Sequence, residues 1–238
     1  MTESEQRRRP GTGPAVVYDG LRRSIIEQTL QPGARLPEDA VAVQFGVSRT
    51  VVRSALDRLT AEGLVTRPNN RSARVASPSL EECADLFDLR VAVEGLVVQR
   101  LAGVLSEDQA SRLLAHVECE QAARGDNRPE AIRLAGEFHI LLAELTGSAA
   151  LTRSVSDLVS RCSLVLTGTK SPHSSECAID DHLDLVQKLS CTAGKGAGAL
   201  MTRHLHAVLG RASLHDASLR NPRLCRTSSG QEPASRRQ

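Results

Sequence analysis

The 238-residue chain is long enough for one large domain or two small ones, and a net charge of only +2 excludes a general polycation. Aromatic residues make up 2% and Trp is absent, so we expect an aliphatic core, which favours packed helices over an aromatic-rich β-sandwich. No apolar run reaches the roughly 18 residues of a membrane span, and the first residues lack the apolar core of a secretory signal. The six cysteines form no CxxC pair, which excludes a zinc ribbon and fits reduced thiols in the cytoplasm.

The first third of the chain has the pattern of three helices followed by a hairpin. Apolar residues recur with helical spacing in three segments, and two strand-like segments then flank a turn rich in Pro, Asn and Ser. Gly46 separates the second helix from the third. The expected elements are helices at 16–30, 38–45 and 49–62 and strands at 64–67 and 73–77.

Two short helices around a glycine turn, followed by a hairpin, form a winged helix-turn-helix, which places its second helix in the major groove of DNA. Ser48 is the expected N-cap of that helix, and Arg49, Thr50 and Arg53 occupy its N-terminal end. Arginine can bind guanine with two hydrogen bonds, and threonine can contact a phosphate or a thymine methyl group. Residues 1–78 contain twelve arginines against eight acidic residues, which permits a nucleic-acid partner. The alternative interpretation is the solvated surface of a small helical domain.

The rest of the chain has a helical pattern throughout, after a boundary near 77–79. Gly, Ser or Pro lies at nearly every junction between the expected helices. The expected helices cover 80–104, 107–124, 129–146, 150–167, 177–191 and 195–218. In the first of them, the predicted core-facing stripe is Leu86, Leu89, Val93, Leu96 with Val97, and Leu101.

Three histidines lie on three different expected helices of this second half: His139, His182 and His204. Imidazoles that converge inside a helical bundle can bind Zn²⁺ or a related divalent ion. Each histidine taken alone is more often a hydrogen-bonded core or surface residue. Their spacing in the sequence does not by itself bring them together.

Several segments of the chain resemble one family of bacterial regulators. LQPGARLPE (30–38), GVSRTVVRSAL (46–56) and EGLV (62–65) resemble the GntR family, and DLFDLRVAVE (85–94) resembles the start of the helical effector domain of its FadR/FCD branch. The resemblance covers about residues 15–218. It implies a homodimer that binds double-stranded operator DNA of palindromic sequence and responds to a small-molecule effector.

The resemblance also implies roles for residues near the wing. Arg35 is expected to contact the phosphate backbone, although a solvated turn residue is the equal alternative. The family usually has glycine at the wing tip, where this chain has Ser72, which puts contact between the wing and the minor groove in doubt. Arg71 remains able to reach the DNA.

In the second half, EFH (137–139), DH (181–182) and RHL (203–205) resemble the metal-binding histidine motifs of the effector domain. Many relatives have Asp one turn before the first histidine, where this chain has Ala135. The implied site has three imidazoles and open positions for water or for the carboxylate of an effector. Arg90 is expected either to bind that carboxylate or to form a helix-surface ion pair with Glu94.

These patterns predict a mainly α protein with an N-terminal winged helix-turn-helix at 14–77 and a bundle of about six helices at 79–218. The tails at 1–13 and 219–238 are expected to be disordered. The predicted function is a ligand-responsive repressor that binds a small organic acid, with a divalent metal as cofactor. One alternative is a regulator that senses the metal directly. A metal-dependent enzyme is a remote alternative, because the chain has no HExxH, GxSxG or phosphate-binding glycine loop.

Overall fold

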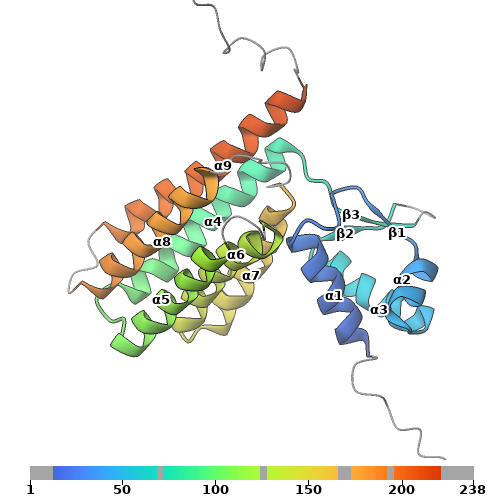
Figure 1. The fold of residues 1–238 in the computed structure, drawn as a ribbon, viewed down its shortest axis with the longest axis horizontal. Coiled ribbons are helices and arrows are strands. Elements are labelled where there is room, and N and C mark those ends of the chain that lie inside the picture. Colours follow the sequence, from blue (N-terminus) through green and yellow to red (C-terminus); the bar gives the residue numbers. More distant parts are fainter. Residues whose placement is uncertain (1–12, 69–71, 124–127, 166–172, 192–195, 221–238) are drawn as a thin grey trace, which may run out of the picture.

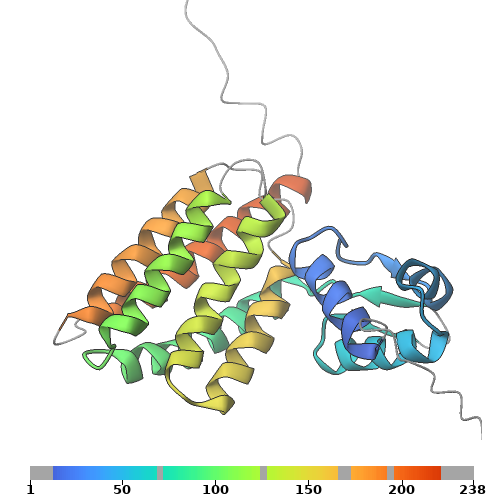
Figure 2. The same cartoon turned by 60° about the horizontal axis from the view of Figure 1, so that its bottom comes forward.

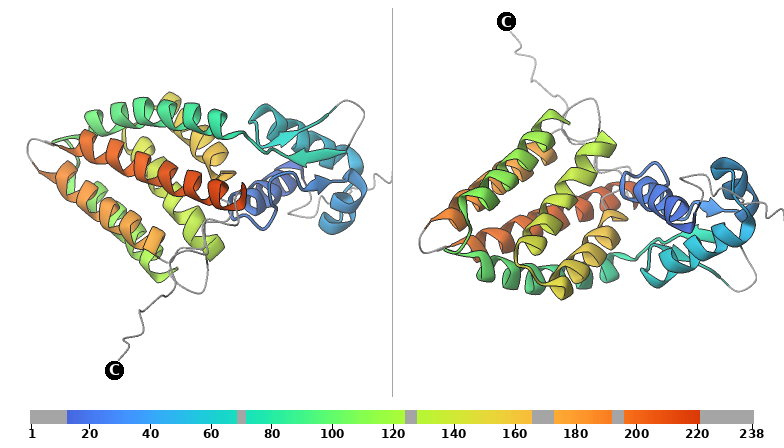
Figure 3. Two further views of the ribbon diagram at one scale, coloured as in Figure 1. Left: turned by 90° about the horizontal axis from the view of Figure 1, so that it is seen from above. Right: turned by 90° about the horizontal axis from the view of Figure 1, so that it is seen from below.

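The computed structural model describes residues 13–68, 72–123, 128–165, 173–191 and 196–220. These residues form a small N-terminal part with a three-stranded sheet and a larger part made of helices, and the two parts lie at opposite ends of the long axis (Figures 1 and 3). The mainly helical fold predicted from the sequence is confirmed. In the described residues, no helix is both long enough and apolar enough to span a membrane.

The N-terminal part packs three helices against a small antiparallel sheet. Its elements are α1 (Pro14–Ile26), β1 (Arg35–Leu36), α2 (Glu38–Phe45), α3 (Arg49–Ala61), β2 (Val65–Thr66) and β3 (Ala73–Val75). The strand order is β1-β3-β2, with Arg35 opposite Arg74 and Val65 opposite Val75. Val17 and Ile25 of α1 and Leu56 of α3 are buried in the core between the helices.

Local signals set the ends of these helices. Gly46 ends α2 with a φ of 64°, a left-handed conformation that glycine adopts without strain. The hydroxyl of Ser48 then accepts a hydrogen bond from the Val51 N–H (3.4 Å) and caps α3, as predicted. The first helix ends at Ile26 rather than at residue 30, because Gln28 turns the chain with a φ of 59°.

Six helices form the described C-terminal bundle, which matches the number expected. They are α4 (Leu80–Leu101), α5 (Glu107–Ala122), α6 (Arg128–Leu145), α7 (Ala149–Ser163), α8 (His173–Ser190) and α9 (Ala197–Arg220). The helix α4 packs on α7 and α9, and α5 packs on α6 and α8, so the six run roughly side by side around one core (Figure 2). Ser79 and Ser106 cap α4 and α5 through reciprocal capping boxes.

The inward face of α4 differs from the predicted stripe. Leu89 and Leu96 are 53% and 40% exposed, so their assignment to the core is wrong. Arg90 and Glu94, which are 4% and 2% exposed, face inward instead. They are accommodated because they form an ion pair with each other, and Glu94 also binds His139.

Specific contacts join the two parts of the molecule. On α1, Arg22 donates a hydrogen bond to Oγ of Ser160 on α7 (2.5 Å). Arg133 of α6 donates from Nε to Glu27, which follows α1 (3.1 Å). Leu164, just after α7, belongs to the hydrophobic core of the N-terminal part. The end of α7 therefore lies directly against the N-terminal part.

Candidate functional site

The N-terminal end of α3 is exposed to solvent. The side chains of Arg49 and Arg53 are 69% and 60% exposed, and Ser48 and Thr50 are exposed beside them. The apolar face of the same helix, with Val52 and Leu56, is buried. The helix thus presents its polar N-terminal turn outward, the end at which backbone N–H groups and the helix dipole favour phosphate.

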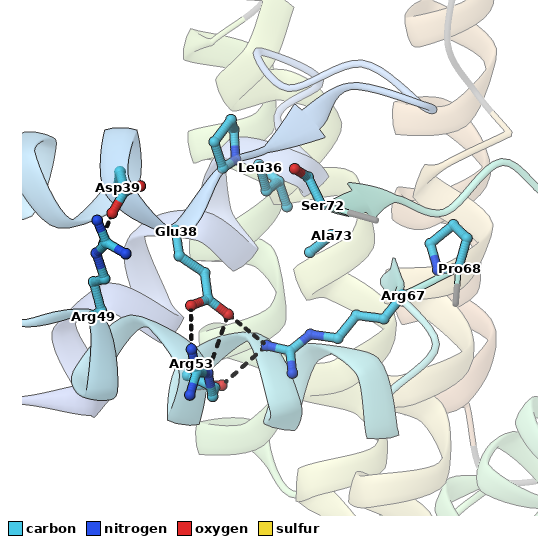
Figure 4. Close-up of a pocket in the computed structure, with 10 residues that line it drawn as sticks. Leu36, Glu38, Asp39, Arg49, Arg53, Arg67, Pro68, Ser72 and Ala73 are labelled. Carbon is cyan, nitrogen blue, oxygen red and sulfur yellow. Dashed lines mark hydrogen bonds and ion pairs between the residues drawn. The ribbon is translucent and has the colours of Figure 1, made fainter. Parts of the chain in front are cut away.

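Carboxylates lie next to the arginines of this surface (Figure 4). Arg53 donates to both carboxylate oxygens of Glu38, from Nε (3.2 Å) and from Nη2 (2.8 Å). This hydrogen bonding to Arg53 is the main cause that holds the pKa of the Glu38 carboxyl below its ordinary value. Arg49 pairs through its Nε with one carboxylate oxygen of Asp39. Both arginines are therefore ion-paired but remain exposed to solvent.

Of the remaining residues predicted to contact DNA, Arg35 lies on the described surface and Arg71 does not belong to the described residues. Arg35 is exposed on β1. Ser72 lines a pocket on this surface together with residues of α2 and α3 and with Arg67 and Pro68, which follow β2. Arg67 ties the start of the wing to α3, because its Nη1 donates to Oδ1 of Asp57 (2.5 Å). Arg71, at the wing tip, falls outside the described residues.

The three histidines converge in the bundle. His139 of α6, His182 of α8 and His204 of α9 are 4%, 1% and 3% exposed. Their ring centroids are 4.9 to 5.3 Å apart, and one nitrogen from each ring lies within 4.8 Å of those of the other two. This separation suits three ligands of one metal ion.

Each of the three imidazoles has a carboxylate at its Nδ1. Glu94 of α4 accepts from His139 (2.5 Å), Glu120 of α5 accepts from His182 (2.9 Å), and Asp181 of α8 accepts from His204 (3.1 Å). A carboxylate at Nδ1 fixes the tautomer and leaves the lone pair of Nε2 free for a metal. The buried Nε2 of His182 has no hydrogen-bond partner in the described part of the chain.

The protonation states of the cluster follow from its burial. Desolvation lowers the pKa of His139 to about 3 and holds that of His182 well below its ordinary value, so both rings are neutral near pH 7. Burial would raise the pKa of Glu94, but the positive charge of Arg90 and the hydrogen bonds from Arg90 and His139 outweigh it and lower the value to about 2. Burial raises the pKa of Glu120 to about 7.

Arg90 lies inside the bundle rather than on the helix surface, so the expected surface position of its ion pair with Glu94 is wrong. Its Nε donates to Oε1 of Glu94 (2.6 Å), and Glu94 in turn binds His139 through its other oxygen. The Nη2 of Arg90 is buried without a hydrogen-bond partner in the described residues. This donor is therefore free to bind an acceptor.

Sequence reasoning missed the three carboxylates. It looked for an acidic residue one turn before His139, where this chain has Ala135. Glu137, two residues before His139, pairs with Arg133 on the side of α6 (2.7 Å). Glu94 lies 45 residues from His139, and Glu120 lies 62 residues from His182. The available signal was the presence of acidic residues within otherwise apolar helical faces.

Comparison with known proteins places both parts in one family. Residues 15–75 match the family described as bacterial regulatory proteins, gntR family, and residues 85–207 match the FCD domain. The chain is 28% identical over 196 residues to the HTH-type transcriptional repressor RspR of Escherichia coli, which covers 81% of this chain and 85% of RspR. It is 26% identical over 178 residues to the uncharacterized HTH-type regulator YdhC of Bacillus subtilis, covering 72% of this chain and 78% of YdhC.

The structural comparison agrees at the level of the fold. The structure of E. coli McbR/YncC superposes with a TM-score of 0.77 at 20% identity, covering 84% of this chain and 97% of that one. The two matched segments span the winged helix-turn-helix and most of the bundle that contains the histidine cluster. The chain therefore belongs to the GntR family of bacterial regulatory proteins, as a DNA-binding transcriptional regulator whose helical part is an FCD domain.

Proposed function

We propose that this regulator is a repressor that binds operator DNA as a homodimer and responds to a small organic acid held at a metal ion in the FCD domain. In this proposal, residues 14–77 read DNA and residues 79–218 bind the ligand and form the dimer. The main support is the exposed, Ser48-capped end of α3, which carries Arg49 and Arg53. The name of RspR supports the assignment as a repressor.

The proposed DNA contacts divide into two kinds. Arg49 and Arg53 read base edges in the major groove, while Ser48, Thr50 and the N-terminus of α3 contact phosphate. Arg35 contacts the phosphate backbone, and Arg71 reaches the minor groove at the wing. Two copies related by a twofold axis would place their α3 helices in successive major grooves, about one helical turn apart.

The outer face of α4 supports the homodimer. Leu89 and Leu96 are exposed there, and Val93 lies between them at helical spacing. Exposed apolar stripes of this kind mark interaction sites. A twofold axis would pair the stripe with its own copy, because such an interface uses the same surface of both subunits.

The metal proposal rests on the chemistry of the donor set. His139, His182 and His204 would hold the ion, because each has a carboxylate at Nδ1, and the unpartnered Nε2 of His182 is the position expected of a ligand atom. Such a set suits Zn²⁺ and related first-row ions. When bound, the ion would supply a Lewis-acid position for the carboxylate of the effector. The unused Nη2 of Arg90 would donate to the same carboxylate.

The DNA-binding proposal is tested with Arg49→Ala and Arg53→Ala in a fluorescence-anisotropy assay on duplexes from the upstream region of the gene. Each variant should lose roughly 5- to 150-fold in affinity, the range expected for one two-hydrogen-bond contact to a base. Arg112→Ala removes a similarly exposed arginine from α5 and should bind as the wild type does. Unchanged binding by both α3 variants would remove these residues from the interface.

The second candidate function is direct sensing of the metal, which the burial of the histidine cluster favours. Metal-free protein is titrated with Zn²⁺ while its DNA affinity is followed, and organic acids are then added. A change with Zn²⁺ alone supports a metal sensor. A change only with an organic acid, on protein that retains the metal, supports the metal as a cofactor. No catalytic residue is proposed, and the named relatives are regulators.

A further inference from the structure

We propose that Glu120 of α5 controls the affinity of the histidine cluster for a divalent cation, by positioning His182 and by supplying a buried negative charge. The inference rests on the metal site proposed above. Glu120 is 3% exposed and comes from a helix that carries none of the three histidines. It is therefore a positioning residue contributed by a separate element.

Glu120 and Phe138 together fix the ring of His182. The two carboxylate oxygens of Glu120 lie 2.9 and 3.2 Å from Nδ1 of His182, in the region of the ring edge. Phe138 stacks on the face of the same ring, with centroids 4.0 Å apart and planes at 12°. One contact limits rotation in the plane and the other limits tilt, so the position of the opposite nitrogen, Nε2, is set.

The charge of Glu120 differs from that of the other two carboxylates. Glu94 is paired with Arg90 (2.6 Å), and Asp181 lies 3.6 Å from the guanidinium of Arg203. Within the described part of the chain, the close contacts of Glu120 with basic groups are with histidines only, Nδ1 of His182 at 2.9 Å and Nε2 of His116 at 3.7 Å.

A buried carboxylate without a permanent cation is unfavourable in the folded protein. A divalent ion at the histidine cluster would supply the opposite charge. The charge of Glu120 is thus better explained by a role in cation binding than by a contribution to the stability of the fold.

The two explanations predict opposite effects for Glu120→Gln. The amide oxygen still accepts a hydrogen bond from Nδ1 of His182, but the charge is lost. If Glu120 serves the cation, the metal-free variant should be at least as stable as the wild type, and its affinity for metal should fall. If Glu120 only supports the fold, the metal-free variant should melt at a lower temperature.

The experiment uses the full-length protein after removal of metal with a chelator. Zn²⁺ affinity is measured by competition with a chromophoric chelator, Co²⁺ binding is followed by its visible absorption, and thermal unfolding of the metal-free protein is recorded. Glu120→Gln should lower metal affinity about 10- to 100-fold and change the Co²⁺ spectrum. Glu118→Gln, an exposed carboxylate on the same helix, should change neither.

The outcomes separate the two proposals. Wild-type protein that binds neither Zn²⁺ nor Co²⁺ would overturn the metal site and this inference together. Wild-type binding that Glu120→Gln leaves unchanged would overturn the inference alone. A metal-free Glu120→Gln protein that is unfolded or clearly less stable would assign Glu120 to the fold, and it would also overturn the inference.

Discussion

At the scale of single residues, Arg53 has two possible partners, the carboxylate of Glu38 and DNA. The carboxylate already occupies Nε and Nη2, so both hydrogen bonds must be exchanged when Arg53 contacts a base. An exposed ion pair of this kind is weak. It nevertheless opposes binding to any duplex, and only a sequence that offers a two-hydrogen-bond contact replaces it fully. Glu38 should therefore increase the discrimination between operator and other DNA.

Glu38→Gln should raise the affinity for a random-sequence duplex, because Arg53 is freed and a negative charge is removed from the DNA-facing surface. The affinity for an operator duplex should change less, so the ratio of the two should fall roughly two- to fivefold. Fluorescence anisotropy at two salt concentrations measures both affinities. Glu118→Gln removes an equal charge far from α3 and serves as the control. An unchanged ratio would show that Glu38 has no part in specificity.

The ionisation of His139 and Glu94 makes the fold sensitive to acid. The pKa of His139 in the folded protein is about 3, below its ordinary value of 6.5, so between these values the unfolded chain binds a proton that the folded chain does not. The contribution of His139 to the free energy of unfolding must then decrease as the pH falls through this window, by up to about 1.4 kcal/mol per pH unit, while Glu120, whose pKa is raised from 4.5 to about 7, contributes with the opposite sign. The pKa of Glu94 is about 2 in the folded protein against an ordinary value of 4.5, so Glu94 extends the loss of stability to lower pH.

Urea unfolding of metal-free protein between pH 7 and pH 4.5 measures this slope. His139→Gln removes one of the titrating groups, so its stability should depend less steeply on pH than that of the wild type. His206→Gln, an exposed histidine on α9, should keep the slope of the wild type. If His139→Gln keeps that slope as well, His139 is not the buried neutral group that the geometry indicates.

At the scale of the elements, the sequence was most informative where local signals define a helix. The bounds of α2 were predicted, and α3 begins at Arg49 as expected, because Gly46 and Ser48 act through the backbone of their immediate neighbours. The strand β1 was not predicted. It has only two residues, and its hydrogen bonds depend on β3, which lies almost 40 residues further along the chain.

The same distinction explains α4 and the histidine cluster. Hydrophobic periodicity assigned Leu89 to the core and allowed Arg90 a surface ion pair. The periodicity carries no information about His139 on another helix, which stabilises the buried pair of Arg90 with Glu94. The place of the three histidines on three predicted helices suggested them as a set, and the family resemblance, rather than their spacing, supported the assignment as metal ligands. No local sequence pattern marks the carboxylate partners on α4 and α5. Glu94 lies 45 positions from His139, and Glu120 lies 62 positions from His182.

At the scale of the whole molecule, a continuous set of contacts runs from the histidine cluster to the DNA-binding part. His139 binds Glu94, Glu94 binds Arg90, and Arg90 in turn interacts electrostatically with Cys162 near the end of α7. The neighbouring residues of α7 face the other way: Ser160 accepts from Arg22 of α1, and Ser163 accepts from Gln28 through its carbonyl oxygen (3.2 Å). A shift of α7 would therefore displace its contacts with α1, and α1 packs on the DNA-binding helix α3.

We expect Zn²⁺ binding to change the amide hydrogen exchange of α1, measured by mass spectrometry on metal-free and metal-loaded protein. Coupling between sites requires that the two states differ at both ends, and the only described side-chain contacts of Arg22 with the bundle are those to Ser156 and Ser160. In Arg22→Ala, the metal should bind with unchanged affinity while its effect on α1 is reduced. Arg23→Ala alters the exposed neighbour on the same helix and should retain the full effect. If α1 responds equally in both variants, the coupling runs through another contact. The contact between Arg133 and Glu27 is then the first to examine, because it joins α6, the helix that carries His139, to the residue after α1.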